Sequence, residues 1–140
     1  MHAAINPPTL SEFLHTAREA FEFLGRFGFA EVAAPIHRRS DPFQIWFGDG
    51  DRFVVVAGEG YGTTASVTLE SNGLELSEIF LVPAAERPGH ARRTRRPNQL
   101  EQVRESARRL ERYGSDFLQG DRTRFVASAK PIPPYKNPID

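Results

Sequence analysis

Apolar residues near the start of the chain recur at the spacing of an amphipathic helix. Thr9, followed three residues later by Glu12, has the pattern of a helix-capping box. Gly28 stands where many helices end in a left-handed residue. The pattern therefore predicts a helix over residues 10–27. Its apolar stripe consists of Leu10, Phe13, Leu14, Ala17, Phe21, Leu24 and Phe27.

After Gly28 the pattern changes to short apolar runs separated by turn residues. Phe43, Ile45 and Phe47 alternate with Gln and Trp, as in a strand with one buried face. Residues 53–56 are continuously apolar and mostly β-branched, which favours a central strand. The runs predicted as strands are residues 29–38, which Pro35 interrupts or edges, 43–47, 53–56 and 65–70.

The links between these runs are short, and Asn72-Gly73 is a strong hairpin signal. Residues 76–82 fit a fifth strand or a short helix, and Ser77-Glu78 favours the helix. Strands that are joined by short links pair antiparallel with their neighbours. We therefore predict an antiparallel meander of four to five strands.

A second long helix opens at Pro97-Asn98 and ends at Tyr113-Gly114. A short helical turn follows from Ser115 and stops at Gly120, and residues 124–127 fit a last strand or turn. Residues 130–140 contain four Pro and predict an extended tail without regular structure. The apolar stripe of the second helix consists of Leu100, Val103, Ala107 and Leu110.

These elements predict an α+β fold in which both helices cover one face of the sheet. We expect a leader over residues 1–8, a single domain over 9–127 and a Pro-rich tail over 128–140. Within the domain, residues 83–97 form an Arg-rich loop.

Composition narrows the possible functions. The 140 residues suit one domain, and eleven Phe can build its core. The absence of Cys excludes disulfides, thiolate nucleophiles and Cys-type metal sites. No apolar run approaches the roughly 20 residues that span a bilayer, and residues 1–8 lack the pattern of a signal peptide. We therefore expect a cytoplasmic protein without a membrane partner.

The net charge of zero hides an uneven distribution. Residues 1–86 carry 5 Arg and 12 Asp or Glu, for a net charge of −7. Residues 87–140 carry 11 Arg, 2 Lys and 6 Asp or Glu, for +7. Such a division marks an interaction face, or else acidic strands that pack beside a basic helix and cancel its charge.

The sequence contains no recognisable catalytic or metal-binding pattern. No two of the four His have the i,i+4 spacing of helical metal ligands. Asp49 and Asp51 lack the further acids of a calcium loop. The Gly-rich residues 58–62 precede a predicted strand, whereas a phosphate loop precedes a helix. We therefore predict no cofactor, no metal and no enzyme. A carboxylate such as Glu59 acting with a His is the least favoured reading.

Three features are candidate contacts with a partner. Trp46 lies on the face opposite Phe43, Ile45 and Phe47, where it is either an exposed anchor or buried beneath a helix. Tyr61 stands at a hairpin tip, which is otherwise only a connector. The third feature is an Arg cluster, which is otherwise a solvated loop and which consists of Arg92, Arg93, Arg95 and Arg96.

Two segments resemble a group of small bacterial proteins. Residues 21–29 resemble the pattern F-x-F-L-x-x-x-G-F at the end of a first helix. Residues 107–121, followed by Phe125, resemble a closing signature A-x-x-L-x-x-Y-G-x-D-x-L-x-G-D. Many members of the group look like immunity proteins, which bind and block a cognate toxin. The resemblance implies a toxin as the partner and brings no catalytic residues. Residues 87–96 and the Pro-rich tail lie outside the shared pattern.

The closing signature also predicts local structure. Gly114 and Gly120 are expected to supply positive φ at two successive helix ends. Asp116 and Asp121 are expected to accept hydrogen bonds from backbone N–H groups near those bends.

The sequence therefore predicts a non-enzymatic protein-binding module, an immunity protein that neutralises a toxin. The alternative is a nucleic-acid-binding accessory domain that uses residues 87–96. A protein partner is favoured because the chain is neutral as a whole and no aromatic residue lies among the Arg residues to stack on bases.

Overall fold

The computed structural model describes residues 7–87 and 98–134. Its sheet contains β1 (Ala30–Val32), β2 (Gln44–Gly48), β3 (Arg52–Glu59), β4 (Thr64–Ser71), β5 (Leu74–Ser77) and β6 (Lys130–Pro131). Its α-helices are α1 (Leu10–Ala20), α2 (Gln99–Tyr113), α3 (Ser115–Leu118) and α4 (Thr123–Ser128). Its 3₁₀ helices are η1 (Glu22–Phe27), η2 (Ile36–Arg38), η3 (Glu78–Leu81) and η4 (Ala84–Glu86).

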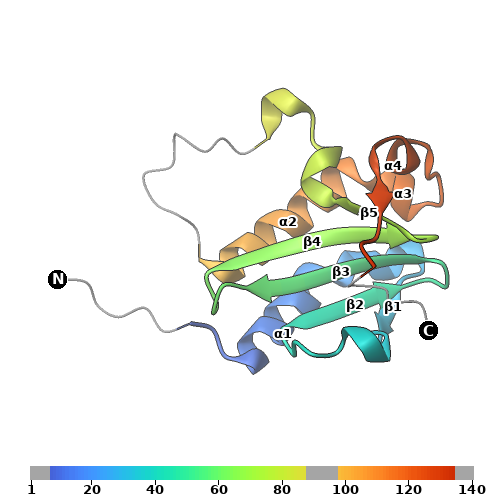
Figure 1. Cartoon of the computed structure of the whole chain (residues 1–140). Helices are drawn as coiled ribbons and strands as arrows, with labels where there is room; N and C mark the ends of the chain where they lie inside the picture. Colours follow the sequence, from blue (N-terminus) through green and yellow to red (C-terminus); the bar gives the residue numbers. More distant parts are fainter. Residues whose placement is uncertain (1–6, 88–97, 135–140) are drawn as a thin grey trace.

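The six strands lie side by side in chain order, and every neighbouring pair is antiparallel (Figure 1). This arrangement confirms the predicted α+β fold and its antiparallel meander. The sheet has one strand more than predicted because Lys130 and Pro131 pair with Glu75 and Leu74. The prediction that residues 130–140 lack regular structure was therefore wrong for Lys130 and Pro131. Pro is tolerated there because β6 is an edge strand.

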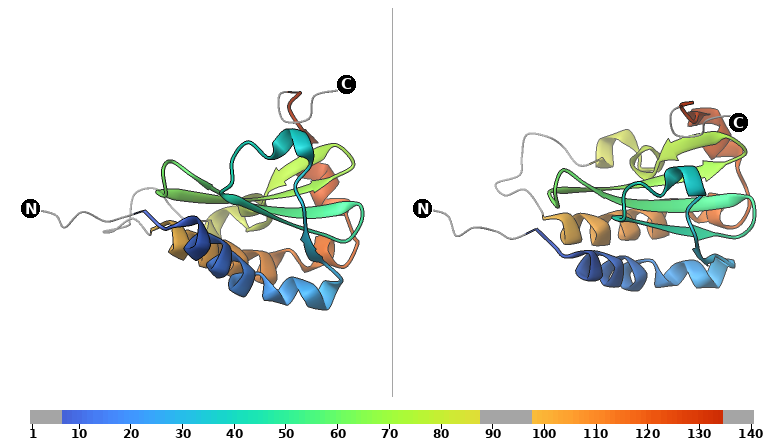
Figure 2. Two further views of the ribbon diagram at one scale, coloured as in Figure 1. Left: turned by 90° about the horizontal axis from the view of Figure 1, so that it is seen from below. Right: turned by 60° about the horizontal axis from the view of Figure 1, so that its bottom comes forward.

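Helices α1 and α2 lie next to each other on one face of the sheet, as predicted (Figure 2). The strand register explains why that face is apolar. Ile45 is opposite Val56, and Val56 is opposite Val67, so three neighbouring strands place apolar side chains on the same face. These side chains belong to a single core with Phe13 of α1 and Leu110 of α2.

The first helix is capped as predicted but changes type along its length. Thr9 and Glu12 form the reciprocal capping box, and Gly28 ends the segment with φ of 86°. The α-helix stops at Ala20, and a 3₁₀ helix continues to Phe27. Phe21, Leu24 and Phe27 are spaced three residues apart, which is the repeat of a 3₁₀ helix. The tighter winding therefore keeps these three residues on one line facing the core.

Three other predictions needed correction. Only Ala30–Val32 of residues 29–38 is a strand, because Pro35 lacks an N–H group and is the N-cap of the 3₁₀ helix η2. Both readings of residues 76–82 hold in part, since β5 ends at Ser77 and η3 follows at once. Residues 124–127 belong to helix α4, which buries Phe125, and form neither a strand nor a turn.

Helix α2 begins with a capping box between Asn98 and Glu101. Its buried face starts at Gln99, whereas the predicted stripe started at Leu100, which is only half-buried. The Gln99 side chain is fully buried, and its Nε2 donates a hydrogen bond to the Thr64 carbonyl oxygen at 2.8 Å. A polar side chain thus anchors the start of α2 to β4.

The closing signature forms the corner that joins α2, α3 and α4. Gly120 has the predicted positive φ, at 104°, whereas Gly114 has φ of −107°. Asp121 accepts a hydrogen bond from the Thr123 N–H at 3.0 Å, as predicted. The Asp116 carboxylate mainly binds a side chain, the guanidinium of Arg124, which contacts both its oxygens at 2.9 Å. This pairing lowers the pKa of Asp116 below its ordinary value.

Space, and not backbone freedom, accounts for Gly114. A Cβ atom at this position would lie 2.5 Å from Leu110 Cδ1 and 2.9 Å from the Leu110 carbonyl oxygen. We expect Gly114→Ala to lower the free energy of unfolding by about 1–3 kcal/mol, as overpacking does. Chemical denaturation would measure the loss. Gly25→Ala is the matched control because a Cβ there would meet no atom within 4 Å. Equal stability of the two variants would contradict this explanation.

Candidate functional site at the β3–β4 hairpin

Of the predicted contact residues that the structure describes, one is exposed and the other is buried. Tyr61 is 99% exposed at the tip of the β3–β4 hairpin. Trp46 is only 3% exposed, so it cannot serve as the exposed anchor that was one of its two readings. The Arg38 guanidinium lies 4.8 Å from the indole centroid, which places Trp46 beneath the 3₁₀ helix η2. Arg92, Arg93, Arg95 and Arg96 lie outside the described residues.

The hairpin tip is an unusual turn. Glu59 pairs with Thr64, and the chain between them has positive φ at three successive residues, Gly60 (63°), Tyr61 (56°) and Gly62 (89°). The Thr63 hydroxyl closes the turn by donating to the Gly60 carbonyl oxygen at 2.7 Å. A bulky residue rarely adopts positive φ, because its Cβ crowds the backbone. Tyr61 is therefore held in an unfavourable conformation with its ring in solvent.

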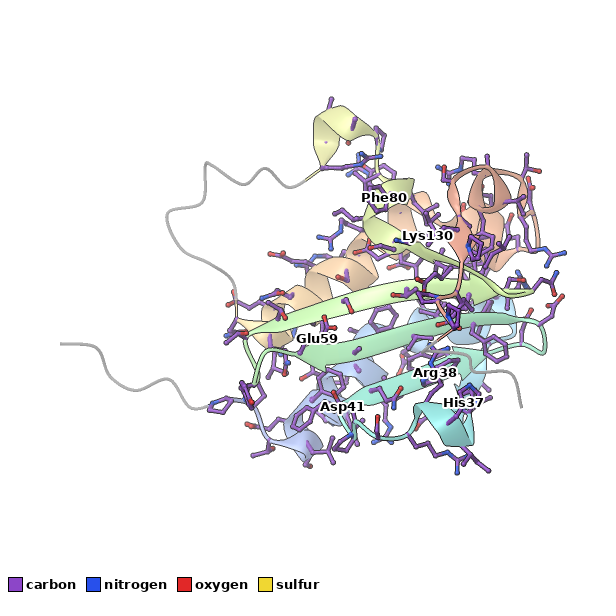
Figure 3. All side chains as sticks on the ribbon, viewed as in Figure 1. His37, Arg38, Asp41, Glu59, Phe80 and Lys130 are labelled. Atoms are coloured by element: carbon purple, nitrogen blue, oxygen red, sulfur yellow. The ribbon has the colours of Figure 1, made fainter. Side chains whose placement is uncertain are left out.

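A cavity of about 470 Å³ adjoins this hairpin. It lies where the hairpin meets the segments that lead into α1, β2 and α2. Pro7, Pro8 and Phe43 line it with apolar surface, while Asp41, Glu59 and Gln99 line it with polar groups. Figure 3 labels Asp41 and Glu59 at the same end of the sheet, although they belong to different segments of the chain.

The side chains of Asp41, Glu59 and Gln99 bring hydrogen-bond acceptors to the lining of this cavity. One oxygen of Asp41 accepts from the Phe43 N–H at 2.9 Å, which fixes the carboxylate in the segment just before β2. Gln99 is fully buried, and its Oε1 accepts no hydrogen bond among the described residues. No Lys, Arg or His is among the residues that the structure describes as lining the cavity. The site therefore combines negative charge with an unused amide oxygen.

The sequence reading found Tyr61 but not the cavity beside it. Phe43 was predicted on the buried face of a strand, and its half-buried position here is compatible with that prediction. Gln99 was missed because the predicted stripe began one residue later. Its position four residues before Val103, on the same helix face, was the one available signal.

A second cavity of about 410 Å³ lies on the β5 side of the sheet. Phe80 is 54% exposed at its rim, and the Arg87 guanidinium lies 5.2 Å from the centre of its ring. Glu75 and Lys130 also line this cavity, so both signs of charge are present. Figure 3 shows Phe80 and Lys130 away from the segments that carry Asp41 and Glu59.

Within residues 7–87 and 98–134, no three His, Asp or Glu side chains are grouped so that they could hold a metal ion. In the same part of the chain, no helix has the length and apolar character needed to cross a bilayer. No protein-family model, curated protein or solved structure matches this chain.

Proposed function

We propose that this chain is a non-enzymatic protein-binding module of the cytoplasm that binds a cognate bacterial toxin and neutralises it. The resemblance of residues 21–29 and 107–121 to immunity-like proteins supports the identity of the partner. The β3–β4 hairpin is proposed as the binding surface because of the conformation and exposure of Tyr61.

Tyr61 is a poor residue for the stability of its turn. Asn72, the other non-Gly residue with positive φ in the described chain, occupies an Asn-Gly turn, where this conformation is favoured. Tyr has no such preference, and a residue held in this region costs on the order of 1–3 kcal/mol. Its exposed ring recovers none of that cost by burial. Strain of this kind at a solvent-exposed aromatic residue is typical of a functional position, and Tyr is among the residues that dominate binding energy at interfaces.

The proposed action is occlusion of the toxin. A specific complex buries about 1,200–2,000 Å² in total, far more than one side chain provides. The hairpin tip, the prolines beside it and the cavity rim would together form the centre of such a contact. Tyr61 would insert into the toxin surface, and the surrounding residues would exclude water from the contact.

Nucleic-acid binding is the alternative function, and the described surface favours it less. Arg104 and Arg108 of α2 line a groove between α1 and α2, but Glu19 and Glu111 line the same groove. Mixed charge weakens attraction to a polyanion, which depends on neutralising successive phosphates. Binding to nucleic acid that falls steeply with added salt, in the absence of any protein partner, would favour this alternative.

We expect the product of the adjacent gene to be toxic alone and to co-purify with this chain. Tyr61→Gly should weaken that complex by about 30-fold or more, the loss expected at an interface hot spot. The variant should keep its folding stability within about 1 kcal/mol, because Gly relieves the strained φ but also loosens the unfolded chain. Calorimetric titration and thermal unfolding would measure the two effects.

Phe80→Ala is the matched control for Tyr61→Gly. It removes an exposed aromatic ring from the second cavity, away from the hairpin. We expect it to leave toxin affinity unchanged. A complex weakened by Phe80→Ala and not by Tyr61→Gly would move the interface to the β5 side of the sheet. A neighbouring protein that is harmless and does not bind would refute the proposed function.

A further inference from the structure

We infer that the hairpin cavity is a receptor for one arginine side chain of the protein partner. The inference rests on the proposed function for the source of that arginine. The chemistry of the cavity can be tested without the toxin.

The polar side chains that line the cavity favour a ligand that has several hydrogen-bond donors. The Gln99 amide has already used one donor on the Thr64 carbonyl oxygen, and its Oε1 remains without a donor among the described residues. An acceptor that is buried without a partner is unfavourable, so a ligand that draws the Gln99 side chain toward it and donates to Oε1 would gain affinity. The two carboxylates, Asp41 and Glu59, add only acceptors.

The carboxylates also require that the ligand be cationic. Neither Asp41 nor Glu59 forms an ion pair with the described residues, and within residues 7–87 and 98–134 no cationic side chain lines the cavity between them. A free cation of the partner would therefore find uncompensated negative charge there. Charge complementarity of this kind speeds encounter and suppresses wrong partners.

The shape and walls of the cavity favour guanidinium over ammonium. The acceptors come from three separate parts of the chain, the segment before β2, the end of β3 and the start of α2. A planar guanidinium presents five N–H donors in several directions, whereas a lysine ammonium is a compact and strongly hydrated point charge. Phe43 and the two prolines provide apolar surface against which a guanidinium plane and its methylene stem can pack.

The position of the cavity favours a protein as the source of the arginine. Tyr61 lines the cavity and also stands at the exposed hairpin tip. A partner whose arginine side chain occupies the cavity would therefore also contact the hairpin. Arg is enriched at the centres of protein interfaces, where neighbouring contacts exclude water from it. The cavity would thus fix the register of the partner on the hairpin.

The first test titrates the ¹⁵N-labelled full chain with N-acetylarginine methylamide and follows it by NMR. We expect saturable shifts of the Gln99 side-chain amide and of the Gly60 and Gly62 backbone N–H groups. N-acetylcitrulline methylamide has nearly the same shape without the charge and should bind at least tenfold more weakly. Equal binding of the two probes, or no saturable shift at these groups, would overturn the inference.

The second test uses variants that keep the shape of the cavity. Asp41→Asn together with Glu59→Gln removes both charges, while the new Asn can still accept from the Phe43 N–H. We expect at least a tenfold loss of arginine-probe binding. Glu22→Gln, which neutralises an exposed carboxylate that does not line the cavity, should bind the probe like the unmodified chain. A double variant that binds the probe normally would also overturn the inference.

The two proposals fail separately. A probe that binds as expected to a chain that ignores the toxin would refute the proposed function and leave the arginine receptor standing. A toxin that binds tightly to a chain that shows no probe shifts, with undiminished affinity for the Asp41→Asn, Glu59→Gln variant, would refute only the receptor.

Discussion

Replacing Arg109 with Met should lower the free energy of unfolding by about 3–5 kcal/mol near neutral pH, the cost of leaving a buried charge without its partner. Glu78 of η3 is only 3% exposed, and its carboxylate accepts from Arg109 Nη2 at 2.6 Å and from Arg109 Nε at 3.2 Å. No other cation pairs with Glu78 among the described ion pairs. The substitution would therefore strand a carboxylate in the core.

The loss should depend on pH in a defined direction. Burial raises the pKa of Glu78 above its ordinary value, although Arg109 opposes the shift. Without Arg109 the pKa should rise further. A group whose pKa is higher in the folded than in the unfolded state binds more protons when folded, so the stability it contributes falls as pH rises through that window. The variant should be least stable near pH 7 and recover part of the loss at about pH 5.

Two controls separate the buried charge from the loss of packing. Adding Glu78→Gln to Arg109→Met removes the stranded charge and should restore most of the stability near pH 7, with little remaining pH dependence. Arg18→Met breaks an ion pair with Glu31 whose side chains are 51% and 44% exposed, and should cost less than about 1 kcal/mol. Urea unfolding across pH would compare them. A small, pH-independent loss in Arg109→Met would contradict the argument.

Phe125→Ala should destabilise the chain by about 3–5 kcal/mol, because it removes a large ring from a packed core. Phe125 is 1% exposed in α4, and its ring centroid lies 4.9 Å from that of Phe117 in α3. The pair joins the two short helices of the closing signature to the core. Helices of this length are not stable by themselves, so their packing must hold the corner together.

Val126→Ala is the matched control, since Val126 follows Phe125 in the same helix and is 54% exposed. A surface substitution of this kind should change stability by no more than about 0.5 kcal/mol. The difference between the two variants in denaturant midpoint would measure what the core contact contributes. Similar losses in both would mean that α4 unfolds locally without engaging the core.

Local signals in the sequence identified most elements of the fold. The capping box at Thr9 and the Asn72-Gly73 turn each depend on neighbours in the chain, and the structure confirms both. The alternation of Phe43, Ile45 and Phe47 correctly predicted a strand, but both faces of β2 are covered, because Trp46 is buried as well. The same signals missed β6 and misread α4. A strand containing Pro131 is tolerated only because β5 offers an edge, and α4 depends on the contact between Phe117 and Phe125.

The candidate site shows the same division. Tyr61 stood out in the sequence because glycines flank it, but its positive φ and nearly complete exposure were visible only in the fold. The sequence left open whether Trp46 is exposed or buried. In the fold it is buried, with the Arg38 guanidinium over its ring. Apart from the place of Gln99 on the buried face of α2, the cavity beside the hairpin had no signal in the sequence, because Asp41, Glu59 and Gln99 are far apart in the chain.

By itself, the sequence determined where the two long helices begin, where the hairpins turn and which apolar residues share a strand face, because these properties arise from interactions between residues close in the chain. Only the tertiary structure decided which polar groups are buried, which aromatic rings reach solvent and which acceptors share one cavity. Those outcomes depend on how distant segments pack, and packing brings Gln99 of α2 against the end of the β3–β4 hairpin.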